Sequence, residues 1–128
     1  MKNISSYAPI VLRLGLTAVI IWFGTSQLMN PAQWIGIVPG WATGLSGMSA
    51  GTIVHINGWF EIIAGLMLGI GVWTRWVALI LALHLFVIAS GFGFNAIGVR
   101  DFGLTASMLA LAMFGNDAFC YHYNREQE

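Results

Sequence analysis

Residues 51–94 read GTIVHINGWFEIIAGLMLGIGVWTRWVALILALHLFVIASGFGF. The stretch holds two apolar runs separated by the short segment WTRW at 73–76, and its charged residues are Glu61 and Arg75. Each run has about the 20 apolar residues that an α-helix needs to cross the hydrocarbon core of a bilayer. The sequence therefore predicts two transmembrane helices at about 51–72 and 75–94, joined by a tight turn as an antiparallel hairpin.

Comparable apolar runs at about 8–29 and 98–114 predict two further spans. Across its 128 residues the chain is 58% hydrophobic and 8% charged, with a mean hydropathy of +0.79. A water-soluble domain of this size carries far more charge on its surface. The expected fold is therefore all-α: an integral membrane four-helix bundle with antiparallel up-down topology, forming a single transmembrane domain over residues 1–128.

The remaining composition excludes several classes of function. A formal net charge of zero argues against a nucleic-acid-binding face, which needs clustered basic residues. Cys120 is the only cysteine, which excludes an intramolecular disulfide, a CxxC redox pair and a cysteine-based metal site. We therefore expect no metal site, and no cofactor held covalently or by metal ligation. The first span is too long for the apolar part of a signal peptide and lacks a clear cleavage site, so we expect it to be retained.

The positive charges predict the orientation of the chain. Lys2, Arg75 and Arg125 fall at the amino end, in the second turn and at the carboxyl end, which four spans place on one side. Cytoplasmic segments of membrane proteins are enriched in Lys and Arg. Both termini are therefore predicted to be cytoplasmic, in an inner or plasma membrane, with the connection 30–50 outside. This uncharged connection is rich in apolar and aromatic residues, so it is either an aromatic-belt loop or a lid over the bundle mouth.

Glu61 is the most informative polar residue, because it lies near the middle of the second span. A carboxyl group there is too deep to reach the head groups and must be protonated or paired. His84 lies at a similar depth in the third span, so a Glu61–His84 hydrogen bond is expected if their faces meet. Such a pair can handle protons or bind a ligand. The alternatives are a structural ion pair for Glu61 and a histidine bonded to a backbone carbonyl for His84.

Arg13 lies early in the first span and shares one helical face with Thr17, Ile20, Gly24 and Gln27. This face is predicted to point at the other helices, because a charged group inside the membrane normally finds a partner in the bundle. Alternatively, the long side chain extends to the cytoplasmic head groups.

The outer ends of the spans collect polar groups of both signs. Arg100 and Asp101 begin the fourth span, where a simple helix cap also explains Asp101. His55 lies near this end of the second span, and Asn57 shares the face of Glu61. We expect this mouth to receive a small anion or a quinone head group. The candidate ligand-binding residues are Arg100, Asp101, Arg13, Asn57 and His55, and the candidate proton-handling residues are Glu61 and His84.

The same residues form an ordered pattern. Arg13 and Gly24 stand in the first span, E-x-x-x-G-L-x-L-x-x-G-x-x-T-R runs from Glu61 to Arg75, and R-D-x-G-L begins at Arg100. In order and spacing the chain resembles the DoxX/DoxD family of small four-helix membrane proteins, over about residues 10–113. Members often carry a His-Gly pair and a Lys near the end of the first helix. Here Phe23, Gly24 and Gln27 stand in those places.

The resemblance implies a role beside redox proteins. Members include the small subunit of an archaeal thiosulfate:quinone oxidoreductase, and others are linked to sulfur redox and oxidative-stress complexes. By position, Arg13, Glu61, Arg100 and Asp101 look like the family's polar core. The leading hypothesis is a small membrane subunit of a quinone-linked oxidoreductase, whose partner subunits supply the electron-transfer cofactor. Two alternatives stay open: a structural or assembly subunit of a larger membrane complex, and a homo-oligomeric transporter or channel for a small solute.

Overall fold

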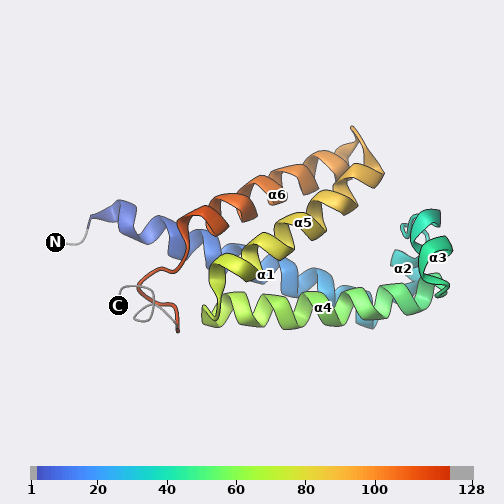
Figure 1. Ribbon diagram of the computed structural model, residues 1–128, viewed down its shortest axis with the longest axis horizontal. Coiled ribbons are helices and arrows are strands. Elements are labelled where there is room, and N and C mark those ends of the chain that lie inside the picture. Colours follow the sequence, from blue (N-terminus) through green and yellow to red (C-terminus); the bar gives the residue numbers. More distant parts are fainter. Residues whose placement is uncertain (1–2, 122–128) are drawn as a thin grey trace.

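The computed structural model describes residues 3–121, and its regular elements are helices (Figure 1). Lys2 and Arg125, on which the predicted orientation partly rests, lie outside the described residues. In chain order the elements are the 3-10 turn η1 (Ile4–Tyr7), α1 (Ala8–Met29), α2 (Pro31–Ile35), α3 (Gly40–Ser46), α4 (Ala50–Ile70), α5 (Thr74–Phe92) and α6 (Ala96–Phe114).

Within residues 3–121, four helices are long and apolar enough to cross a membrane: α1 with the preceding η1, α4, α5 and α6. These helices lie where the sequence predicts spans, with ends within two residues of those predicted. Successive spans run in opposite directions, and the short helices α2 and α3 lie together at one end of the bundle (Figure 1). The chain is therefore a small multi-pass membrane protein in contact with the lipid bilayer.

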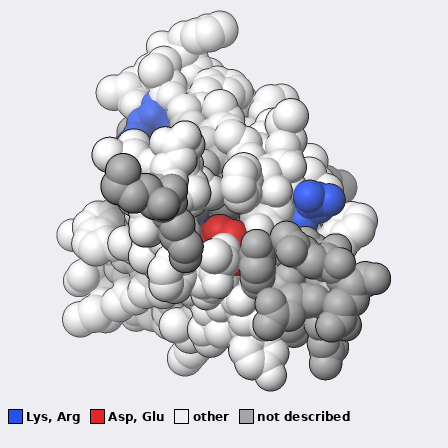
Figure 2. All heavy atoms as spheres, turned by 90° about the vertical axis from the view of Figure 1, so that its left-hand side faces the viewer, with Lys and Arg blue, Asp and Glu red and all other residues white. Residues whose placement is uncertain are grey.

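The surface of the opposite end fits this environment. Figure 2 looks at the end where α4 turns into α5, and most of its described atoms are uncharged. Blue Lys and Arg atoms and red Asp and Glu atoms form only small, separate patches. Large apolar side chains along the helices are exposed, as expected for surfaces that face lipid tails.

The four spans pack as two pairs rather than as four equal neighbours. The most extensive helix contacts join α1 to α4 and α5 to α6, whereas α4 and α5 touch far less. Figure 1 shows α4 and α5 separating as they run away from the turn that joins them. The predicted tight turn is present, since α4 ends at Ile70, Gly71 follows it with a left-handed φ of 85°, and α5 begins at Thr74. The predicted hairpin is thus splayed, and residues of both pairs line the cavity of the candidate site.

Two glycines bring α1 and α4 into close contact. A Cβ atom on Gly24 would lie 2.8 Å from the backbone oxygen of Gly58, and one on Gly58 would lie 3.0 Å from that of Gly24. Real side chains do not tolerate such distances to backbone, so both positions need glycine. Small residues of this kind let membrane helices approach closely. This contact sets the distance between Gln27 of α1 and Glu61 of α4, each of which follows one of these glycines by three residues.

An apolar core joins the two pairs in the half of the bundle nearer the turn between α4 and α5. Its largest fully buried members come from all four spans: Ile20, Leu68, Leu81, Met108 and Leu111. Buried side chains pack at the density of organic crystals and leave little room for water. This layer separates the end of the bundle that carries α2 and α3 from the opposite end.

Candidate functional site

Glu61 is the centre of a buried polar cluster between α1, α4 and α5. Its Oε2 atom accepts a hydrogen bond from Gln27 Nε2 at 2.8 Å, and its Oε1 atom accepts one from Asn57 Nδ2 at 3.1 Å. His84 Nε2 lies 3.2 Å from the same Oε1. Asn57 Nδ2 also donates to Gln27 Oε1 at 2.7 Å, which closes the cluster. The structure therefore contains the expected Glu61–His84 contact.

Helical geometry explains why these residues meet. Asn57 precedes Glu61 by four residues, which turns it by only about 40° around the α4 axis. Gln27 lies on the buried face of α1, as the sequence predicts, and Gly24 one turn earlier keeps the two helices close. His84 reaches the carboxylate from α5 and packs against the Phe60 ring at a centroid distance of 4.9 Å. Three helices thus hold one carboxylate.

The cluster forms part of the wall of a cavity of about 540 Å³. Its polar lining comprises Gln27, Asn57, Glu61, His84 and the pair Arg100–Asp101. The other walls are apolar and aromatic, and they come from α1, the 30–50 connection, α4, α5 and the start of α6: Phe23, Trp34, Ile37, Val38, Trp41, Ile53, Val54, Leu85, Val87, Ile88, Phe92 and Ile97 among others. A cavity of this size that combines apolar walls with a few convergent polar groups is typical of small-molecule sites.

The connection 30–50 covers this cavity. Trp34 Nε1 donates a hydrogen bond to Ser26 Oγ at 3.2 Å, and the Trp34 ring meets the Phe23 ring edge-on at 6.0 Å. Residues of α2, of α3 and of the link between them line the cavity. Of the two interpretations of this connection, the structure therefore favours a cover over the mouth.

Arg100 and Asp101 stand at the rim of the cavity. Arg100 Nε donates to Asp101 Oδ1 at 3.1 Å, and its guanidinium carbon lies 5.1 Å from the centroid of the Phe23 ring. The Arg100 side chain is 49% exposed, whereas that of Asp101 is buried. The prediction that Asp101 caps the helix is wrong. The helix begins at Ala96, two residues earlier than expected, and Asn95 is the cap, since its Oδ1 accepts from Gly98 N–H at 2.8 Å.

Two of the predicted ligand-binding residues do not reach the cavity. His55 is exposed, and its Nδ1 lies 2.9 Å from the backbone oxygen of Gly51 in its own helix. It precedes Glu61 by six residues, which rotates it by about 240° around the helix axis, so helical geometry already separates the two. Arg13 is absent from the cavity wall. The structure places it in a second cluster beyond the apolar core.

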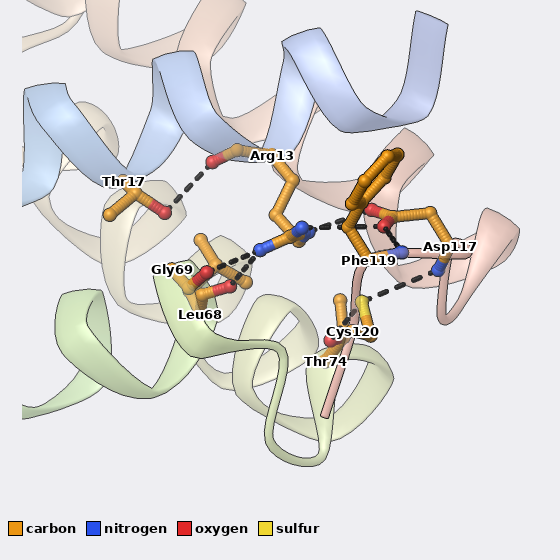
Figure 3. A network of polar contacts seen from close by, with 8 residues as sticks. All are labelled: Arg13, Thr17, Leu68, Gly69, Thr74, Asp117, Phe119 and Cys120. Atoms are coloured by element: carbon orange, nitrogen blue, oxygen red, sulfur yellow. Dashed lines mark hydrogen bonds and ion pairs between the residues drawn. The ribbon is translucent and has the colours of Figure 1, made fainter. Parts of the chain in front are cut away.

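This second cluster is drawn in Figure 3. Arg13 is 1% exposed, and its Nε atom donates to Asp117 Oδ2 at 2.7 Å. Its Nη1 donates to the backbone oxygens of Leu68 at 3.1 Å and Gly69 at 2.5 Å. These carbonyls belong to the last turn of α4, whose oxygens have no partner within the helix. Arg13 therefore does not extend to the head groups; it caps α4 and pairs with the segment after α6.

The segment after α6 crosses the same end of the bundle. Tyr121 N–H donates to the Ile70 oxygen at 3.1 Å, and Cys120 packs so closely on Gly71 that a Cβ there would lie 2.5 Å from the Cys120 Cα. Burial alone would raise the pKa of Asp117. The hydrogen bond from Arg13, the backbone N–H of Phe119 and the Arg13 charge outweigh it and hold this pKa below its ordinary value of 3.8. The cluster thus fastens this segment to α1 and α4.

Sequence reasoning missed two members of these clusters. Gln27 was placed on the inward face but not beside Glu61, because it lies in the last turn of its span whereas Glu61 lies near the middle of α4. Asp117 lies beyond the last span in a short polar stretch, where nothing in the sequence marks it as the partner of Arg13. Among the described residues, no three His, Cys, Asp or Glu side chains lie close enough to hold a metal ion.

Comparisons with known proteins identify the family. The model of the DoxX family matches residues 8–96, which include Arg13, Gln27, Glu61 and His84 and end before Arg100. Searches of curated proteins and of solved structures gave no match. The match covers most of the chain and most of its membrane-spanning part, so the chain belongs to the DoxX family.

Proposed function

We propose that this protein is the small membrane subunit of a redox complex and that it binds a quinone head group in the cavity beside Glu61. The observation that carries the proposal is the buried carboxylate itself. Glu61 is held by Gln27, Asn57 and His84 at the inner wall of a cavity with aromatic sides. Ionisable groups inside the membrane are costly and usually mark a functional site.

The shape and lining of the cavity suit an amphipathic ring compound. Phe23, Trp34, Trp41 and Phe92 offer aromatic surfaces, while His84 and Arg100 offer hydrogen-bond donors for carbonyl oxygens. Val87 and Ile97 line the cavity and are among the exposed apolar residues. In this proposal the cavity opens to lipid beside them, so an isoprenoid tail can remain in the bilayer while the head group enters.

The polar residues match the chemistry of quinone reduction, which takes up two electrons and two protons per quinone. The electrons come from a partner subunit in this proposal. His84 and Glu61 form a hydrogen-bonded pair able to pass a proton to a ring oxygen, as positioned acids and bases do. Arg100, with an exposed guanidinium at the rim, stabilises negative charge that develops on the opposite oxygen.

A structural or assembly role is the second candidate, and one observation favours it. The Glu61 carboxylate already has partners for both oxygens within the chain, so it is satisfied without any ligand. Buried polar networks of this kind can fix helix packing. Under this alternative the cluster stabilises the bundle or its assembly, and the chain has no quinone-dependent activity.

The experiment starts from mild-detergent purification out of the native membrane, with mass spectrometry of the proteins and lipids that accompany the chain. The proposal predicts redox subunits and quinone in the wild-type sample. Glu61→Gln, which keeps the shape of the side chain, should leave the complex assembled and lower its quinone-dependent turnover. The control is Ser107→Ala on the exposed part of α6, which should change neither. Absence of quinone together with loss of assembly in Glu61→Gln would instead support the structural role.

A further inference from the structure

The Glu61–His84 cluster and the Arg13–Asp117 cluster lie on opposite sides of the apolar core. This arrangement limits the routes by which a proton can reach Glu61. Glu61 and His84 belong to the cavity under α2 and α3, whereas Arg13 and Asp117 belong to the opposite end. Along α4, seven residues separate Glu61 from Leu68, whose oxygen binds Arg13, which corresponds to about 10 Å at 1.5 Å per residue. A single hydrogen bond spans about 3 Å, so a proton needs several intermediate groups to cross this distance.

Among the residues that the structure describes, the layer between the clusters offers no such groups. Ile20, Leu68, Leu81, Met108 and Leu111 are each 0% exposed and come from all four spans. A buried water needs polar partners, and a well-packed apolar layer does not hold water. Within residues 3–121, the polar side chains nearest this layer bond to their own helices: Thr17 donates to the Arg13 oxygen, and Thr105 donates to the Asp101 oxygen.

On the other side, Glu61 has a polar connection to the cavity. Its side chain is 4% exposed, but that of His84, in contact with it, is 22% exposed and lines the cavity wall. The other charged or titratable groups that face this cavity are Arg100 and Asp101 of α6. The neutral amides of Gln27 and Asn57 complete the surroundings of the carboxylate. Both members of the Glu61–His84 pair thus border the cavity, and His84 is the more exposed of the two.

We infer that Glu61 and His84 exchange protons through the cavity with the α2–α3 side of the membrane alone, and that the apolar core closes the route to the opposite side. This goes beyond the proposed function, because it concerns access to Glu61 whether or not a quinone binds. In a quinone-linked complex it means that protons used at this site come from the side of α2 and α3. The positive-inside prediction makes that the outer side.

The test measures which aqueous phase reaches the position beside Glu61. Native Cys120 is first replaced by Ala, and single cysteines are then introduced for reaction with a hydrophilic, membrane-impermeant maleimide in right-side-out and inverted vesicles. Leu45→Cys and Ile4→Cys, at 84% and 88% exposed positions, report the α2–α3 side and the opposite side respectively. His84→Cys places a thiol beside Glu61, and Leu81→Cys places one in the apolar core.

We expect His84→Cys to react only in the preparation in which Leu45→Cys reacts, and Leu81→Cys to react in neither. Ile88→Cys, which lines the cavity and keeps His84, should behave like His84→Cys and shows that the result does not depend on losing the histidine. Reaction of His84→Cys from the Ile4 side, from both sides or from neither side would overturn the inference. No quinone is added, so the outcome is distinct from success or failure of the proposed function.

Discussion

The ion pair between Arg13 and Asp117 gives the clearest stability prediction. Both side chains are 2% exposed, their Nε and Oδ2 atoms lie 2.7 Å apart, and Asp117 lies beyond the last span. Asp117→Asn keeps the shape of the side chain and removes its charge. The Arg13 guanidinium then stays buried without a counter-charge, and its acceptors are the Leu68 and Gly69 carbonyls and the one amide oxygen that Asn retains.

Removing one partner of a buried ion pair typically lowers the free energy of unfolding by about 3–5 kcal/mol. Because two carbonyl bonds to Arg13 remain, we expect the lower end, about 3 kcal/mol, or roughly a hundredfold in the unfolding equilibrium. Arg13→Met should cost a similar amount, since it leaves Asp117 and two carbonyls without their donor. The double variant should cost about 2 kcal/mol less than the sum of the single variants, because the two side chains interact directly.

The assay is reversible unfolding of the purified protein in bicelles or by SDS titration, applied to the wild type, both single variants and the double variant. Salt should leave the effect of Asp117→Asn nearly unchanged, because buried pairs are screened far less than exposed ones. A destabilisation by Asp117→Asn below about 0.5 kcal/mol, the level of an exposed pair, would refute the reasoning. Strict additivity of the two single changes would refute it as well.

Three further predictions concern packing, pH and the ligand. Gly24→Ala should lower the free energy of unfolding by about 1–3 kcal/mol, because the new Cβ would lie 2.8 Å from a backbone oxygen of α4, whereas Gly15→Ala, with open space around it, should be neutral or slightly stabilising in the same unfolding assay. Since the pKa of Asp117 is lowered in the folded state, its contribution is present above its ordinary pKa of 3.8 and lost as pH falls through the lower folded value. Acid unfolding curves of Asp117→Asn should lack this component. Asn57→Leu should weaken quinone binding about tenfold in an equilibrium titration, because it removes the amide that holds Gln27 and Glu61 in place at the cavity wall.

The spans were predictable from the sequence because the bilayer imposes a length and an apolar composition that few other structures share. The pairing of the spans was not. Helices in a membrane are apolar on nearly all sides, so no polar stripe marks which neighbour each one packs against. The close approach of α1 and α4 at Gly24 and Gly58, and the separation of α4 from α5, are therefore visible only in three dimensions.

The candidate site was predictable where depth alone determines contact. Glu61 and His84 lie at matching depths on neighbouring spans, and the structure brings them together. Depth in the membrane alone is misleading when the rotation of the side chain around the helix axis is ignored. His55 is an example, because its side chain is exposed on the outside of the bundle. The Arg13–Asp117 pair joins residues 104 positions apart, one of them outside the spans, and such a pair depends on where the segment after α6 packs.

The most direct test of the proposed function is quinone binding by the isolated protein, followed by quenching of its tryptophan fluorescence. Trp34 and Trp41 line the cavity, whereas Trp76 lies at the start of α5 and is exposed away from it. A short-chain quinone titrated into the protein in lipid nanodiscs should give saturable quenching. Replacing both cavity tryptophans with Phe should abolish most of that quenching, and Trp76→Phe should retain it. Quenching that does not saturate, or that is the same in all three proteins, would contradict a quinone site beside Glu61.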